Sequence, residues 1–268
     1  MQPVAISDRE FDDVRQWLRE ASGIHLSDQK KQLVVGRLNK RLAACGCRSY
    51  GDYMRLVRSR TDAHERQRAI DLLTTNETSF FREPKHFEHL RAKLRTHPRG
   101  RRFRVWSAAS SSGEEAYTTA MVLADELGDA PWEILATDLS LRVLEHARAG
   151  LYPMERSAQI PRELLRRYCL KGTGPYAGQF LIERRLRERV SFAQVNLLQP
   201  LPEVGTFDVI FLRNVLIYFE IDTKRQVVAR LIRQLAPDGM FFIGHSETLN
   251  GVYEDLVTVA PTVFRRAG

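Results

Sequence analysis

The chain has 268 residues, of which 43% are hydrophobic and 28% charged, and its formal net charge is +8. This composition is typical of a globular protein, and no stretch approaches the roughly 18 consecutive apolar residues that a membrane helix needs. The first residues lack a basic start and an apolar run, so we expect no signal peptide, and three cysteines cannot pair into a disulfide framework. These features exclude secreted, membrane-spanning and disulfide-stapled classes and indicate a cytoplasmic protein.

The positive charge is concentrated near the N-terminus. Residues 30–70 contain eleven Lys or Arg and three acidic residues, a local charge of +8. A surface of this kind attracts nucleic acid, anionic lipid or an acidic protein, although a solvated face without a partner fits the same composition.

Residues 1–73 have the pattern of a small, all-helical domain. A capping-box spacing at residues 7–10, followed by apolar residues at helical intervals, predicts the first helix. Further helices are expected over residues 27–44, 50–58 and 62–73. Four basic side chains lie on or near one face of the second helix, beside its apolar face: Lys30, Arg37, Lys40 and Arg41.

From about residue 90, strands alternate with helices. Strands are expected at residues 103–109, 132–138, 190–195, 207–212 and 240–243, and helices at 114–127, 141–149 and 224–235, the last ended by residues 237–239. This alternation predicts a parallel, doubly wound sheet, in which ligands bind outside the carboxyl ends of the strands.

Residues 151–189 interrupt the alternation with a short helix, a Gly-Pro turn and β-like segments, which we interpret as an inserted β-subdomain. The chain is therefore divided into a helical domain (1–73), a linker (74–89) and a Rossmann-like domain (90–268) that carries the insertion.

Two features of the expected sheet favour an adenosine-type ligand. The turn at residues 110–113 precedes a helix that opens with Glu114 and Glu115. Two acids there disfavour pyrophosphate and suit a cationic or uncharged ligand, although they can equally serve only to complement the helix dipole. Asp138 ends the second strand, where an acid can accept hydrogen bonds from both ribose hydroxyls or can simply cap a helix. Together they favour S-adenosylmethionine, a sulfonium cofactor without a pyrophosphate.

Two further segments combine polar and aromatic residues. Residues 74–82 are a polar run that ends in Phe-Phe-Arg, and residues 207–219 are a strand followed by Arg213, Asn214 and Tyr218. Structural packing alone explains either segment taken singly. Cys45 and Cys47 lack a second ligand pair, so no metal site is expected. His86 and His89 share a helix face, and we expect both to be exposed.

Read together, six segments resemble those of one family. They are residues 75–82 (TNETSFFR), 105–117 (VWSAASSSGEEAY), 136–138 (ATD), 195–198 (VNLL), 207–219 (FDVIFLRNVLIYF) and 237–247 (PDGMFFIGHSE). In order and spacing they are similar to the CheR family of chemotaxis-receptor glutamate methyltransferases, which use S-adenosylmethionine. The resemblance implies an α/β fold: a small N-terminal all-helical domain followed by a Rossmann-like class I methyltransferase domain with a small inserted antiparallel β-subdomain. Ser110 and Ala116 depart from the family's common residues.

The resemblance also implies roles for individual residues. The cofactor site would consist of Asn76, Thr78, Arg82, Glu115, Asp138, Asn196, Leu197, Arg213 and Asn214. Arg82 and Tyr218 would be catalytic, steering the reacting groups, and Lys30, Arg37, Lys40 and Arg41 would face the receptor. On this basis we expect Arg37→Glu with Arg41→Glu to impair receptor methylation and to leave cofactor affinity unchanged.

The implied partner is the cytoplasmic helical part of a chemoreceptor, with a C-terminal receptor peptide as a second contact through the β-subdomain. S-adenosylhomocysteine would be the product, and we expect a monomer with no nucleic-acid partner and no membrane insertion. Two other functions stay open. One is an RNA methyltransferase that uses the basic segment, although Tyr50 and Tyr53 offer no clear stacking platform. The other is a regulatory module that binds the cofactor without catalysis.

Overall fold

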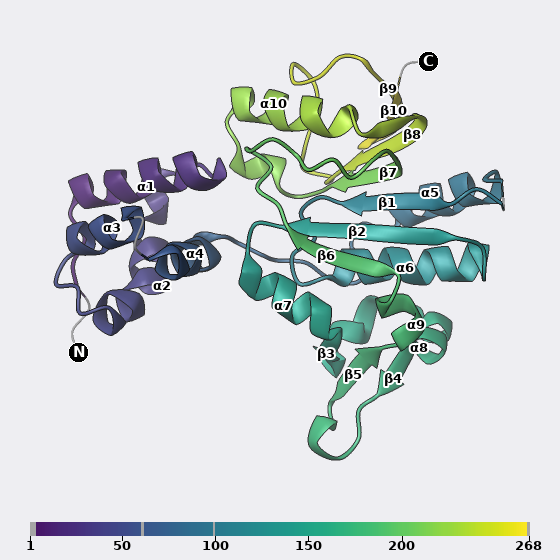
Figure 1. Ribbon diagram of the computed structural model, residues 1–268, viewed down its shortest axis with the longest axis horizontal. Coiled ribbons are helices and arrows are strands. Elements are labelled where there is room, and N and C mark those ends of the chain that lie inside the picture. The colour runs from purple at the N-terminus through teal and green to yellow at the C-terminus, as the bar shows by residue number, and fades with distance from the viewer. Residues whose placement is uncertain (1–3, 60–61, 99, 267–268) are drawn as a thin grey trace.

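The computed structural model describes residues 4–59, 62–98 and 100–266 (Figure 1). Within these residues, the N-terminal helices form a unit of their own: α1 (Asp8–Ser22), α2 (Lys31–Ala44), α3 (Tyr50–Arg58) and α4 (Ala63–Leu73), with a 3-10 turn at Asp28–Lys30. The predicted capping box starts α1, since Ser7 Oγ accepts from the Glu10 N–H and the Glu10 carboxylate accepts from the Ser7 N–H. Leu18, Val34 and Tyr53 are fully buried between the helices.

The second unit is a doubly wound α/β domain built on a mixed sheet. In the described part of the chain, the strand order is β6 (Val190–Gln194), β2 (Trp132–Asp138), β1 (Phe103–Ser107), β7 (Phe207–Leu212), β8 (Leu235–Ile243), β10 (Val263–Arg266) and β9 (Leu256–Ala260). The first five pair in parallel, whereas β10 is antiparallel to both of its neighbours. The order from β6 to β8 is that of a Rossmann-type sheet, so the ligand-binding edge lies at the carboxyl ends of β1 and β7.

Helices cover both faces of this sheet (Figure 1). α5 (Lys85–Arg95) and α6 (Glu114–Leu127) pack on the face that receives Val209 and Phe211 of β7. α10 (Ile221–Ile232) packs on the opposite face, which receives Ile210 and Leu212. α7 (Leu141–Ala149) follows β2 and lies beside β6. Because both faces are covered, every residue of β7 is buried, which explains why all of its residues except Asp208 are apolar. None of the helices described here has both the length and the apolarity needed to cross a bilayer.

The insertion is a three-stranded antiparallel sheet in the order β3 (Leu151–Pro153), β5 (Gln179–Ile182), β4 (Cys169–Lys171), with the helices α8 (Arg162–Tyr168) and α9 (Arg184–Arg187) beside it. Tyr152 and Phe180 from this sheet pack on Phe80 of the linker, and the Phe80 and Tyr152 rings meet edge to face at 5.0 Å. The predicted fold class is therefore confirmed, including the inserted subdomain.

Five details differ from the sequence-based expectations. The C-terminal strands β9 and β10 were not anticipated, and α5 was not assigned as a helix. Helix α10 begins and ends three residues before the expected 224–235. Residues 237–239 lie inside β8 rather than ending the helix, because Phe207 pairs with Leu235 and a register shift takes up the Pro-Asp-Gly sequence. His86 is 1% exposed instead of solvated, since α5 turns it toward Phe242 of β8.

Candidate functional site

A cleft opens at the carboxyl ends of β1, β2, β6 and β7, between the sheet, the linker and the helical unit. It brings together every residue expected in the cofactor site, together with Tyr218. Those residues are Asn76, Thr78, Arg82, Glu115, Asp138, Asn196, Leu197, Arg213 and Asn214. They come from five separate segments of the chain, so their convergence is a property of the fold rather than of sequence proximity.

The turn after β1 approaches the cleft closely because two of its residues adopt left-handed backbone conformations. Ser111 has φ 50° and Gly113 has φ 95°. A Cβ on Gly113 would lie 2.8 Å from Ala147 Cβ and 2.9 Å from the Tyr152 hydroxyl, so only glycine fits there. Ser111 Oγ donates to Asn76 O at 2.8 Å, which ties this turn to the linker.

Asp138 ends β2 with its carboxylate buried at the floor of the cleft. It accepts hydrogen bonds from the backbone N–H groups of Ser111 and Ser140, each at 2.9 Å. Burial raises the pKa of Asp138, and these backbone hydrogen bonds oppose that shift. Two donors leave further lone pairs on the carboxylate, which is the arrangement that a ribose diol requires.

A buried ion-pair network forms the opposite side of the cleft. The Arg213 guanidinium, whose side chain is 2% exposed, donates to Glu115 Oε2 at 2.8 Å and to Glu83 Oε2 at 2.9 Å. Glu115 also accepts from Ser107 Oγ at 2.6 Å. Two carboxylates therefore share one guanidinium, and the cluster carries one net negative charge beside the cleft. That charge suits a ligand with a cationic part.

Hydrogen bonds to backbone carbonyl groups hold the linker in place. Arg82 donates from Nη1 to Glu77 O at 3.0 Å, and Thr78 O accepts from Arg156 at 2.7 Å. Burial raises the pKa of Tyr218, whereas the nearby Arg82 charge acts in the opposite direction. Tyr218 is therefore a neutral phenol near pH 7 and a hydrogen-bond donor at the cleft.

Asn196 and Leu197 both line the cleft, but each polar atom of the Asn196 side chain already has a partner within the protein. Its Nδ2 donates to Ala21 O at 2.8 Å, and its Oδ1 accepts from the Leu198 N–H at 3.0 Å. Asn196 therefore fastens the helical unit to the α/β domain. Leu197 is buried and offers an apolar surface to the cleft.

The four basic residues expected to face a partner divide into two pairs. Lys30 and Lys40 are exposed. Arg37 is half-buried and donates to Leu73 O, Thr74 O and Thr75 Oγ1, so it supports the linker. Arg41 makes two hydrogen bonds to the buried Glu65 carboxylate. These contacts revise the expected outcome of the Arg37→Glu and Arg41→Glu pair, since both changes would also disturb the protein's own structure.

Sequence reasoning missed two sets of residues around the cleft. Ser22 and Ile24, at the end of α1, line it directly, and no motif marks them. Glu83, His86 and His245 lie together at its rear, with three potential metal-ligating atoms within 4.8 Å of one another. The Glu83 carboxylate in this cluster is already paired with Arg213, which disfavours a metal ion there. That the chain binds no metal stays a prediction. The available signal was that Glu83 directly follows the matching segment 75–82 and that His245 lies within the matching segment 237–247.

The chemistry of the cleft fits S-adenosylmethionine. Asp138 is positioned for a diol, and Leu139, Val195 and Leu197 offer apolar surface for a purine. The negative cluster suits the positive charges of the sulfonium and the α-ammonium group. When bound, the cofactor would supply an electrophilic methyl group. The fold and the cleft together define a Rossmann-like class I methyltransferase.

Comparison with known proteins then gives the family. The model described as "CheR methyltransferase, SAM binding domain" matches residues 76–264, and "CheR methyltransferase, all-alpha domain" matches residues 9–74. The chain belongs to the CheR methyltransferase family, and S-adenosylmethionine is its cofactor.

Relatives of known function extend over nearly the whole chain. It is 41% identical over 264 residues to the chemotaxis protein methyltransferase of Escherichia coli K12, covering 97% of this chain and 92% of that protein. It is 40% identical to chemotaxis protein methyltransferase 2 of Pseudomonas aeruginosa, covering 96% and 93%. Among solved structures, a glycopeptide N-methyltransferase complexed with S-adenosyl-L-methionine aligns with a TM-score of 0.37 at 18% identity, covering 63% of this chain and 51% of that one.

Proposed function

We propose that this protein transfers a methyl group from S-adenosylmethionine to glutamate side chains on the cytoplasmic helical part of chemoreceptors. The product would be a glutamate methyl ester, and the reaction would adapt chemosensory signalling. The observation that carries the proposal is the cleft, in which every residue that the CheR resemblance implies for the cofactor site converges, together with Tyr218. The relatives named as chemotaxis protein methyltransferases, matched over more than 90% of both chains, support it.

The proposed chemistry asks little acid–base work of the protein. A glutamate carboxylate, with a usual pKa of about 4.3, is ionised at pH 7 and is already a nucleophile. Positioning and exclusion of water are the remaining tasks. We assign Tyr218, as a neutral donor, to orienting one carboxylate oxygen and Arg82 to holding the acceptor by charge. A guanidinium in direct contact would weaken the nucleophile, so Arg82 is proposed as an orienting group.

The proposed docking surface is the exposed part of the basic helical unit. Lys30 and Lys40 project into solvent, and a receptor helix that presents glutamates is anionic. Attraction between the two would raise the association rate. A second proposed contact is the inserted sheet, whose edge strand β4 includes the exposed Leu170. Such an edge suits an extended C-terminal receptor peptide. A cytoplasmic monomer remains our prediction.

The direct test is transfer of a radiolabelled methyl group to a purified cytoplasmic receptor fragment. We expect label that alkali releases as methanol, because carboxyl esters are base-labile, and no label on a fragment whose candidate glutamates are replaced by alanine. Transfer to RNA instead would establish the RNA methyltransferase. Binding of S-adenosylhomocysteine without transfer to either substrate would favour the regulatory module.

The two kinds of basic residue give contrasting predictions. We expect Lys40→Glu to slow receptor methylation by about threefold to tenfold at low salt, with the loss shrinking as salt rises, because Lys40 acts only through long-range attraction. Cofactor affinity should not change. Arg37→Glu should weaken binding of S-adenosylhomocysteine as well, because Arg37 supports Thr74 and Thr75 at the cleft.

Calorimetry with S-adenosylhomocysteine and methylation rates at two salt concentrations would check both variants. Equal cofactor affinity in Lys40→Glu and Arg37→Glu would contradict the supporting role of Arg37. A methylation loss in Lys40→Glu that is independent of salt would contradict the docking role of Lys40.

A further inference from the structure

Glu83 is an acidic residue immediately after Arg82 whose side chain is 11% exposed, and it does not itself line the cleft. Its carboxylate nevertheless accepts from Arg213 and Asn214, which follow β7 and line the cleft, and from His245, which follows β8. Oε2 accepts from Arg213 Nη2 at 2.9 Å and Nε at 3.3 Å. Oε1 accepts from the His245 N–H at 3.1 Å and from Asn214 Nδ2 at 3.4 Å. One carboxylate thus joins the linker to the carboxyl ends of β7 and β8.

The backbone around Glu83 is arranged to make this contact. Phe81 and Glu83 have φ of 51° and 58°, a left-handed conformation that side-chain-bearing residues rarely adopt. Arg213 Nη2 also donates to Arg82 O, so the guanidinium contacts both the Glu83 side chain and the backbone of the residue before it. Strained conformations of this kind persist where surrounding contacts hold them, and they cluster at functional sites.

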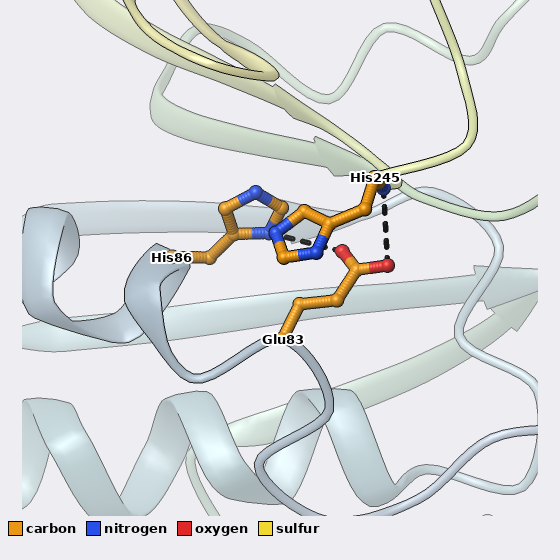
Figure 2. Close-up of side chains that lie close together, drawn as sticks. All are labelled: Glu83, His86 and His245. Atoms are coloured by element: carbon orange, nitrogen blue, oxygen red, sulfur yellow. Dashed lines mark hydrogen bonds and ion pairs between the residues drawn. The ribbon is translucent and has the colours of Figure 1, made fainter.

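The His86 ring lies beside the Glu83 carboxylate, as Figure 2 shows. Its Nε2 lies 2.8 Å from Thr262 Oγ1, and its Nδ1 lies 3.4 Å from Glu83 Oε2 without a hydrogen-bond partner. The His245 ring meets the His86 ring edge to face at 5.0 Å. The Glu83 side chain is only 11% exposed, and this low exposure strengthens its interaction with Arg213.

We propose that Glu83 is a positioning residue for the cofactor: its carboxylate fixes Arg213 and Asn214 in the orientation that the bound cofactor requires. Arg213 can then present a fixed charge to Glu115, and the Asn214 amide keeps one rotamer at the cleft. The inference rests on the cofactor assignment and needs no particular methyl acceptor. Its failure can therefore be told from failure of the proposed function, because wild-type cofactor binding is measured without a receptor.

A metal ion is the competing explanation for the cluster. Glu83, His86 and His245 can each offer one ligand atom, and His86 Nδ1 lacks a partner. The Arg213 guanidinium, however, already occupies Glu83 Oε2 and would repel a divalent cation placed there. The positioning role is therefore favoured, and zinc serves as a test.

The experiment compares Glu83→Gln with Glu88→Gln, an exposed glutamate on α5 one residue past Phe87. We expect Glu83→Gln to raise the dissociation constant for S-adenosylhomocysteine by on the order of tenfold to a hundredfold, as loss of an orienting partner does at other sites, at unchanged calorimetric stoichiometry. The KM for S-adenosylmethionine should rise in parallel, and Glu88→Gln should match wild type. A fall in folded fraction with unchanged affinity of the folded molecules would show a merely structural role and overturn the proposal.

Arg213→Lys provides the second arm. If Glu83 acts through Arg213, the effects of Glu83→Gln and Arg213→Lys on the dissociation constant will be strongly non-additive in the double variant. Full additivity would overturn the proposal. So would a thermal stabilisation of the wild-type protein by Zn²⁺ that His245→Ala abolishes, because Glu83 would then serve as a metal ligand.

Discussion

Replacing Asp138 with asparagine is expected to weaken S-adenosylhomocysteine binding by about 2–3 kcal/mol, roughly a 30- to 150-fold rise in the dissociation constant. The carboxylate accepts from two backbone N–H groups and has lone pairs left for a ribose diol. In asparagine, an amide nitrogen replaces one of the two carboxylate oxygens. That nitrogen is a donor, so it can accept neither from the backbone N–H at its position nor from a ribose hydroxyl. Isothermal calorimetry measures the change directly.

Stability should respond much less than binding in this variant. Burial raises the pKa of Asp138, which means that the folded state disfavours its charge. Asparagine removes that cost, and this gain offsets part of the loss from the backbone N–H that no longer has an acceptor. Asp129→Asn, at an exposed position after α6, is the matched control and should match wild type in both measurements. Unchanged affinity in Asp138→Asn would remove Asp138 from the cofactor site.

Replacing Arg213 with methionine should have the largest effect on folding. It would leave Glu115 and Glu83 buried without their shared cation, and removing one partner of a buried ion pair costs about 3–5 kcal/mol. We expect the urea midpoint to fall accordingly, with an unchanged dependence of the unfolding free energy on urea.

A double variant can distinguish the loss of charge pairing from a simple loss of packing. Arg213→Met with Glu83→Gln removes one of the two stranded charges, so it should recover part of the lost stability. A double variant less stable than Arg213→Met alone would mean that the destabilisation comes from shape rather than from charge.

The candidate site was largely predictable because its residues sit in short motifs at strand ends. Asp138 ends a strand, and Arg213 and Asn214 follow another, so a parallel sheet brings them to one edge whatever the rest of the chain does. Sequence alone could not reveal the partners of these groups. The approach of Arg37 to the linker spans 36 to 38 residues, and the burial of His86 depends on β8 and on Thr262.

The elements that were missed lack a local signal. Strand β9 has the exposed residues Val257, Thr258 and Val259 in a row, so no alternation marks it. Residues 237–239 read as a helix stop, yet the pairing of Leu235 with Phe207 extends the strand across them. In both cases tertiary pairing overrode local propensity.

The cleft is walled by two units, since Ser22 and Ile24 come from the helical unit and Asp138 from the α/β domain. A ligand that contacts both walls adds its binding free energy to the docking of one unit against the other. By linkage, a change that weakens the docking of the two units must also weaken the binding of the ligand. A substitution buried at the seam, such as Gly23→Ala, where a Cβ would lie 2.9 Å from a methyl of Leu198, should therefore weaken the cofactor from outside the cleft. The helical unit thus acts as a thermodynamic part of the cofactor site as well as the proposed docking surface.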